Sequence, residues 1–211
     1  MLHIKGFTFN PFQENTYIIY NQNKDCWIVD PGMCTVAEEQ ALYSFIESDG
    51  LKPQSIINTH GHIDHVFGVD ALKQKYGIRF GIHTADEPIV RNAANSAAMF
   101  GLPFGASPHP DFFIEAGTMK LADDEIQVLF VPGHSPGSVA FYYAPGQWLL
   151  GGDVLFQGSI GRTDLPGGDF NTLINSIKTQ LFPLPDDTVV YSGHGGPTTI
   201  GEEKLHNPFL K

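Results

Sequence analysis

Thr59-His60-Gly61-His62-Ile63-Asp64-His65 is the most distinctive stretch of this chain, because three histidines and one aspartate follow one another so closely after an apolar run. Packing gives no reason to gather titratable groups in this way, whereas neutral imidazole nitrogens and carboxylate oxygens are ordinary zinc ligands. A single glycine separates His60 from His62, so both side chains can face one point. Asp64 and His65 follow at the predicted start of a helix and can face a second point. The stretch therefore suits two neighbouring metal ions better than one.

Further candidate ligands occur where the chain leaves other predicted strands. The apolar runs Val128–Val131, Trp148–Leu150 and Val189–Tyr191 each end in a turn of small residues. The residues that follow these turns are His134, Asp153 and His194. Functional groups commonly lie at the carboxyl ends of strands in α/β folds. The chain thus repeats one arrangement, a strand followed by a tight turn and a candidate ligand.

In this order, the motifs resemble those of the metallo-β-lactamase superfamily. Gly151–Phe156, Gly158–Pro166 and Gly193–Phe209 resemble its short glyoxalase II branch, the hydroxyacylglutathione hydrolases. The resemblance covers essentially the whole chain. It implies an α/β fold, an αββα four-layer sandwich of two pseudo-symmetric halves, with residues 1–211 as a single domain and the site at one edge.

The resemblance also implies a set of ligands for two divalent metal ions. One ion is held by His60, His62 and His134. The other is held by Asp64, His65 and His194, and Asp153 bridges the two. Zinc is the first expectation, with iron or manganese as alternatives. Asp64 and Asp153 are the expected catalytic carboxylates, because they position a hydroxide that bridges the ions.

The implied activity is hydrolysis of a small acyl thioester, such as S-D-lactoylglutathione, to an acid and a thiol. No residue stands out as a general acid, which suits a thioester because a thiolate leaves without protonation. Three alternatives stay open: a mononuclear iron persulfide dioxygenase, a lactonase-type metallohydrolase and a partner-binding module without turnover. A β-lactam substrate is disfavoured, because neither Cys26 nor Cys34 lies where some β-lactamases place a metal-binding cysteine.

Contacts with the substrate are predicted at Arg162 and Phe104. Arg162 is expected either to pair with Asp164 and brace the loop, or to reach a substrate carboxylate. Phe104 lies in the aperiodic stretch Met99–Phe113, which is either a packed connector or a lid. The residues after His194 hold only two lysines, so few partners for a glutathione tail are expected. This predicts a high KM for lactoylglutathione together with a substantial kcat.

Local sequence patterns argue against a serine nucleophile and predict several helices. Gly133-His134-Ser135-Pro136-Gly137 matches a serine hydrolase motif, but that motif needs a following helix, and the next residues predict a strand. Capping boxes at Thr35–Glu38 and Thr84–Glu87 predict helices, the second continuing through Ala97. A further helix is predicted over Val66–Tyr76. Asp30 is expected to be a turn or supporting residue, not a ligand.

Composition argues against several partners. The formal charge is −11 and no run of basic residues occurs, so neither nucleic acid nor an anionic membrane surface is expected as a partner. The first residues lack the pattern of a signal peptide, and no apolar stretch approaches the ~20 residues of a membrane span. Two cysteines form no disulfide framework, so a cytoplasmic location is the expectation. The sequence predicts no oligomeric state.

Overall fold

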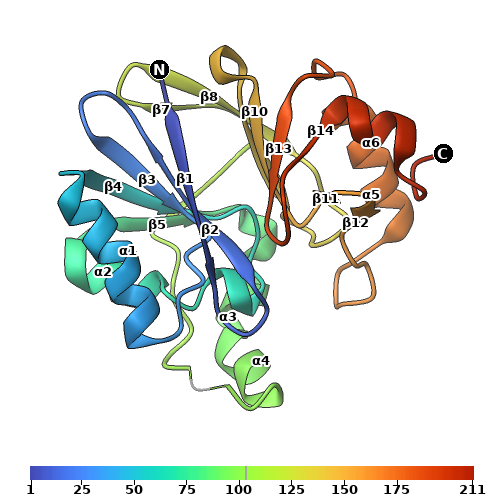
Figure 1. The fold of residues 1–211 in the computed structure, drawn as a ribbon. Helices are drawn as coiled ribbons and strands as arrows, with labels where there is room; N and C mark the ends of the chain where they lie inside the picture. The colour runs from blue at the N-terminus through green and yellow to red at the C-terminus, as the bar shows by residue number, and fades with distance from the viewer. Residues whose placement is uncertain (103) are drawn as a thin grey trace.

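Two β-sheets face each other between outer helices in the computed structural model, which describes residues 1–102 and 104–211 (Figure 1). This confirms the predicted αββα sandwich. Each main sheet has six strands. No helix among these residues is long and apolar enough to cross a membrane.

The first sheet joins an antiparallel half to a parallel half. Its strands, in spatial and chain order, are β1 (His3–Phe9), β2 (Glu14–Tyr20), β3 (Asp25–Val29), β4 (Lys52–Ile57), β5 (Arg79–Ile82) and β6 (Phe112–Phe113). From β3 onward the pairs are parallel, and a parallel pair needs a crossover connection. Helices α1 (Val36–Ser48) and α2 (Val69–Tyr76) make two of these crossovers and cover the outer face (Figure 1).

The second sheet is mainly antiparallel. In spatial order its strands are β14 (Thr198–Thr199), β13 (Val189–Ser192), β10 (Trp148–Gly152), β9 (Val139–Tyr143), β8 (Asp124–Phe130) and β7 (Gly117–Leu121). Strands β10 and β13 pair in parallel, and their crossover includes α5 (Phe170–Ser176) and a π-helical turn, Ile177–Leu181. A small ribbon follows β10, and a last helix follows β14. These elements are β11 (Leu155–Phe156), β12 (Ser159–Ile160) and α6 (Ile200–His206).

The central strands β2, β3, β9 and β10 are buried on both faces, which explains why they are runs of mostly apolar residues without alternation. Successive side chains of a strand point to opposite faces. Ile56 accordingly belongs to the cluster beneath α1 and α2, whereas Ile57 belongs to the cluster between the sheets. Leu149 packs toward α5 in the same way, and Leu150 packs between the sheets. Three apolar layers thus hold the sandwich together.

The predicted capping box at Thr35–Glu38 is confirmed, but the one at Thr84–Glu87 is wrong. Residues Thr84–Asp86 form a 3-10 turn capped by the His83 ring, which accepts a hydrogen bond from the Ala85 amide. The single helix predicted through Ala97 is two helices, α3 (Glu87–Arg91) and α4 (Ala93–Met99). The Glu87 carboxylate pairs with Arg91 instead of closing a cap.

The helix predicted from Val66 begins later, at Val69, because a separate 3-10 turn carries the end of the metal motif. That turn is Ile63–His65, and it gives Asp64 and His65 directions that a continuous helix would not. The predicted loop Met99–Phe113 includes residue 103, which lies outside the described residues, and it ends in β6. Whether this stretch acts as a lid stays a prediction.

Aromatic side chains that are buried between the two sheets are expected to stabilise the fold. Phe141 on β9 is fully buried there, so Phe141→Ala should lower the free energy of unfolding by about 3–5 kcal/mol. Phe113→Ala is the control, because Phe113 is 48% exposed, and it should cost less than about 1 kcal/mol. Urea denaturation measures both. Equal losses would contradict the assigned core.

Candidate metal centre

All seven predicted ligands converge at one edge of the sandwich. His60, His62, Asp64 and His65 follow β4, and the other three follow β8, β10 and β13. Backbone hydrogen bonds join these loops both between the two sheets and within the second sheet. The Val139 amide donates to the Thr59 carbonyl (2.8 Å), and the Gly193 amide donates to the Gly152 carbonyl (2.9 Å). The fold therefore brings together residues that lie far apart in the chain.

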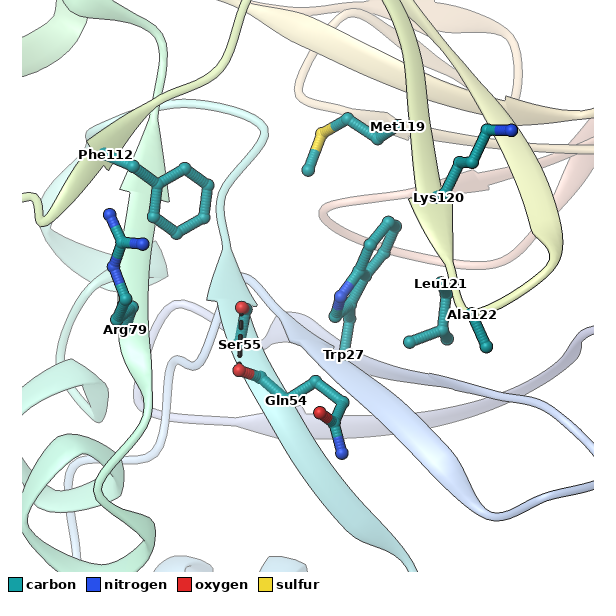
Figure 2. Close-up of a pocket in the computed structure, with 9 residues that line it drawn as sticks. All are labelled: Trp27, Gln54, Ser55, Arg79, Phe112, Met119, Lys120, Leu121 and Ala122. Carbon is teal, nitrogen blue, oxygen red and sulfur yellow. Dashed lines mark hydrogen bonds between the residues drawn. The ribbon is translucent and has the colours of Figure 1, made fainter.

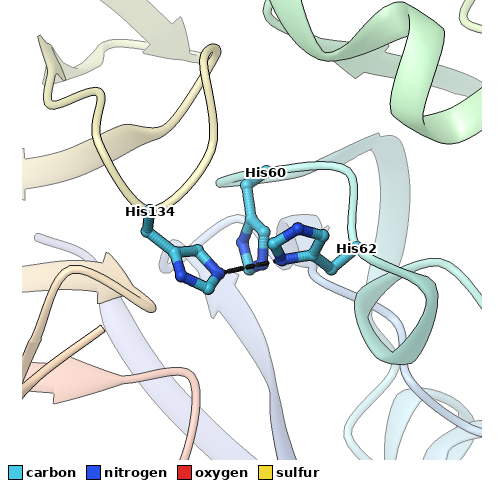
Figure 3. A group of neighbouring side chains, drawn as sticks. All are labelled: His60, His62 and His134. Atoms are coloured by element: carbon cyan, nitrogen blue, oxygen red, sulfur yellow. Dashed lines mark hydrogen bonds between the residues drawn. The ribbon is translucent and has the colours of Figure 1, made fainter. Parts of the chain in front are cut away.

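The first histidine group consists of His60, His62 and His134 (Figure 3). His62 Nδ1 lies 2.9 Å from His134 Nε2, which lies 3.3 Å from His60 Nε2. Burial lowers the pKa of His60 well below its ordinary value, and burial together with His134 lowers that of His62 to about 3. The three imidazoles thus point their nitrogens at one place, as a metal ligand set requires.

In His134 and His60, the hydrogen bond made by Nδ1 determines that Nε2 is the nitrogen available to a metal ion. His134 Nδ1 lies 2.8 Å from the Arg162 carbonyl, which can only accept, so Nδ1 donates and Nε2 carries the lone pair. The Thr59 hydroxyl donates to Asp30, so it accepts from His60 Nδ1 at 3.1 Å. Both Nε2 lone pairs therefore face the group. Such outer contacts are what orient histidine ligands in metal sites.

The second group consists of Asp64, His65 and His194. His194 Nδ1 donates to the Phe12 carbonyl (3.0 Å), and its Nε2 lies 3.2 Å from Asp64 Oδ2. Burial alone would lower the pKa of His65, but the carboxylates of Asp64 and Asp153 raise it to about 9. Burial opposes the same effect at His194, where hydrogen bonds to both carboxylates raise the pKa to about 10.

Asp153 lies between the two groups. One of its oxygens, Oδ2, is 3.4 Å from His194 Nε2 and 3.6 Å from His134 Nε2. Burial would raise its pKa, but His65 and the hydrogen bond from His194 hold that pKa well below the ordinary value. Oδ1 of Asp153 and both ring nitrogens of His65 are buried without hydrogen-bond partners. Buried polar atoms normally have partners, so these residues fit a pair of cations. Their role as ligands stays a prediction.

Sequence reasoning missed Glu14, a fully buried carboxylate behind the second group. Its Oε2 accepts the Thr16 hydroxyl (2.9 Å), while Oε1 has no partner and lies 3.8 Å from His65 Nδ1. Burial, followed by the nearby Asp30, raises its pKa well above the ordinary value. Asp30 itself is 3.2 Å from the same nitrogen, which agrees with the supporting role predicted for it.

Asp86 is a second missed residue, and it ties the two loops of the first histidine group together. Its carboxylate accepts from the Gly61 amide (2.8 Å), the Ser135 hydroxyl (2.7 Å) and the Gly137 amide (2.6 Å). A Cβ on Gly137 would lie only 2.7 Å from the Asp86 nitrogen, so the close approach requires glycine there. This use of Ser135, with strand β9 following, supports the rejection of a serine nucleophile.

The predicted substrate contacts have different outcomes. Arg162 lines the cavity over the site, and its guanidinium pairs with Asp164 through two hydrogen bonds (2.7 and 2.8 Å), as the structural alternative expects. Phe104 packs edge-on against Phe67 and is not among the described residues that line the cavity. The substrate contact predicted for Phe104 therefore has no support in this geometry.

The cavity over the site has a volume of about 940 Å³, which is ample for a small-molecule substrate. The candidate ligands that line it are His62, Asp64, His134, Asp153 and His194. A smaller hollow of about 410 Å³ lies between the sheets (Figure 2). Its described lining includes Trp27, Phe112 and Met119, and contains no histidine, cysteine or carboxylate.

The fold and the site indicate a metal-binding protein, because histidines and carboxylates gather at one edge of a two-sheet sandwich. The chain matches the metallo-beta-lactamase superfamily over residues 9–194, and it belongs to that superfamily. It is 40% identical to the hydroxyacylglutathione hydrolase GloC of Haemophilus influenzae, over 99% of this chain and 98% of that protein.

Two solved structures are similar over nearly the whole chain. One is titled BLEG-1 B3 metallo-beta-lactamase, with 39% identity, a TM-score of 0.91 and coverage of 99% of this chain and 100% of that one. The other is TTHA1623 in a di-iron-bound form, with 39% identity, a TM-score of 0.89 and coverage of 98% and 100%. These relatives confirm the predicted superfamily and fold. The superfamily and the similarity to a hydroxyacylglutathione hydrolase support a metal-dependent hydrolase.

The contacts of Asp86 predict a specific defect. Asp86→Ala leaves the buried amides of Gly61 and Gly137 without an acceptor, while the Ser135 hydroxyl keeps Ser138 as a partner. The change should cost about 3 kcal/mol of stability and weaken metal binding by about tenfold or more. Zinc titration of metal-free protein and urea denaturation measure the two effects. Glu87→Ala, at a neighbouring ion pair with Arg91, is the control and should cost less than about 0.5 kcal/mol. Unchanged metal affinity in the Asp86 variant would refute the assigned role.

Proposed function

We propose that this protein is a dinuclear metal-dependent hydrolase of small acyl thioesters, of the glyoxalase II type. The observation that carries the proposal is the presence of two ligand groups on either side of Asp153. The 40% identity to a hydroxyacylglutathione hydrolase supports the thioester as substrate. Zinc remains the first metal to test, and the di-iron-bound relative supports iron as the alternative.

When bound, two divalent ions supply a hydroxide at neutral pH and polarise the substrate carbonyl. The side chains of this protein prepare that chemistry. Neutral His60 and His62 offer lone pairs without first losing a proton, as their lowered pKa values indicate. Asp64 and Asp153 bring two negative charges, which offset part of the four positive charges of the ions. Backbone carbonyls of Phe12 and Arg162 keep His194 and His134 in position.

The residues that line the cavity suit a leaving group that needs no proton. Arg162 is the one lysine or arginine among the described residues that line the cavity, and it is paired with Asp164. Arginine stays protonated at any working pH, so it is a poor proton donor. A thiolate leaves without a proton, whereas an alkoxide or amine anion does not. The site is therefore better suited to a thioester than to an ester or an amide.

Asp153 provides the direct test of the two-group arrangement. Asp153→Ala should abolish hydrolysis of lactoylglutathione and lower the metal content, because both ligand groups lose a shared carboxylate. Steady-state assays and elemental analysis of the purified variant measure these effects. Asp123→Ala, an exposed aspartate on the β7–β8 turn, is the matched control and should behave as the unaltered protein. Near-normal activity of the Asp153 variant would rule out the dinuclear mechanism.

β-Lactam hydrolysis is the second candidate, because a 39% identical structure is titled a metallo-beta-lactamase. The absence of cysteine from the predicted ligand set favours the thioester. We expect kcat/KM for a penicillin or a carbapenem to be at least about tenfold below that for a thioester, equivalent to about 1.4 kcal/mol of transition-state stabilisation. Comparable values for both substrates, measured on one metal-loaded preparation, would favour the β-lactamase assignment instead.

A further inference from the structure

The cavity above the candidate metal centre is lined mainly by apolar side chains. Ile89 of α3 and Phe100, which directly follows α4, line it, and so do Phe156, Ile160 and Leu165. The Phe100 ring meets the ring of Phe12 edge-on, with centroids 5.4 Å apart. Phe100 is nevertheless 59% exposed. An exposed aromatic ring at the mouth of a cavity offers apolar surface that a bound molecule can cover.

Outside the candidate metal centre, the cavity offers little positive charge to the carboxylates of a carrier. Among the described lining residues, the one lysine or arginine is Arg162, whose guanidinium is already bonded to both oxygens of Asp164. The carboxylates of Asp64 and Asp153 also line the cavity. Glutathione carries two carboxylates, and these would have to compete with Asp164 for a single guanidinium. The cavity therefore offers a glutathione tail little specific binding.

The cavity also has more room than a lactoyl group needs. Its volume of about 940 Å³ is near the upper end for small-molecule sites, and such sites are mainly apolar with a few polar groups for orientation. Outside the candidate metal centre, the polar side chains among the described lining residues are Asn92, Ser96, Ser159 and Arg162. A substrate that fits would place its reacting carbonyl at that centre and its remaining surface against the apolar walls.

We infer that the preferred substrate is a thioester with an extended apolar acyl group, bound between Ile89 and Phe100 on one side and Phe156 on the other. This inference rests on the proposed thioesterase function and specifies its substrate class. Each methylene buried against such walls contributes about 0.8 kcal/mol, which corresponds to about a fourfold change in kcat/KM. The preference should therefore increase steeply with acyl length.

A series of acyl thioesters on one uncharged carrier tests this inference. The acetyl, butanoyl and hexanoyl thioesters of N-acetylcysteamine would be assayed with the metal-loaded full chain. We expect kcat/KM to rise about threefold to fourfold per methylene, and the hexanoyl compound to be a better substrate than lactoylglutathione. A flat series, with all members hydrolysed, would overturn the acyl preference and leave the thioesterase proposal intact.

Substitutions on the cavity wall separate this preference from general hydrophobicity. Ile89→Ser and Phe100→Ser should each flatten the dependence on acyl length. Met99→Ser is the matched control, because Met99 precedes Phe100, is 86% exposed and is not among the described lining residues. It should keep the dependence of the unaltered protein. An equal loss in all three variants would contradict the assigned wall.

Binding of uncleavable analogues decides the inference even without turnover. The ethyl and hexyl thioethers of N-acetylcysteamine would be titrated calorimetrically into the metal-loaded protein. The hexyl compound should bind at least tenfold more tightly, about 1.4 kcal/mol, and Phe100→Ser should reduce that difference. Equal affinities would overturn the inference. If no thioester is hydrolysed but the hexyl compound is preferred, the proposed reaction fails and the apolar binding site stands.

Discussion

Buried carboxylates that hold the ligand loops are the constraint on which this site depends. Asp30 accepts from the amide and the hydroxyl of Thr59, and Asp86 accepts from three donors that follow His60 and His134 in the chain. Asp30 adopts φ 50°, a conformation that costs a residue other than glycine about 1–3 kcal/mol. The hydrogen bonds to Thr59 offset that strain. These contacts fix the loops that carry His60 and His134, so the histidine side chains are aligned before any ion binds.

Much of the fold follows from local sequence patterns. Apolar runs ending in small-residue turns located β4, β10 and β13, and the Thr35 capping box located α1, because those signals are independent of the rest of the chain. The errors arose where tertiary contacts override local preference. At Thr84–Glu87, the loops of the metal motif recruit the Asp86 carboxylate, and the helix starts without the predicted cap. Short pairings such as β11 with β12 lack a periodic signal altogether.

The candidate ligands, the carboxylates that support them and the aromatic residues of the cavity were predictable to different degrees. The convergence of the seven ligand candidates followed from their order and from the resemblance to a known family. Glu14 and Asp86 were not found, since a carboxylate at a strand start or in a helical turn resembles an ordinary surface residue. Phe104 was predicted as a substrate contact, whereas Phe100 and Phe12 line the cavity, because the sequence cannot tell which aromatic side chains face it. Side-chain direction in aperiodic segments is determined by packing, which only the structure reveals.

The central claim is that two ions occupy this edge of the sandwich, on either side of Asp153. The metal content per chain of untagged protein, determined by elemental analysis together with the protein concentration, tests it most directly. The arrangement of ligands predicts a value close to two divalent ions per chain, with zinc in the majority. A value close to one, with iron as the sole metal, would contradict the claim and favour a mononuclear oxygenase of the same fold.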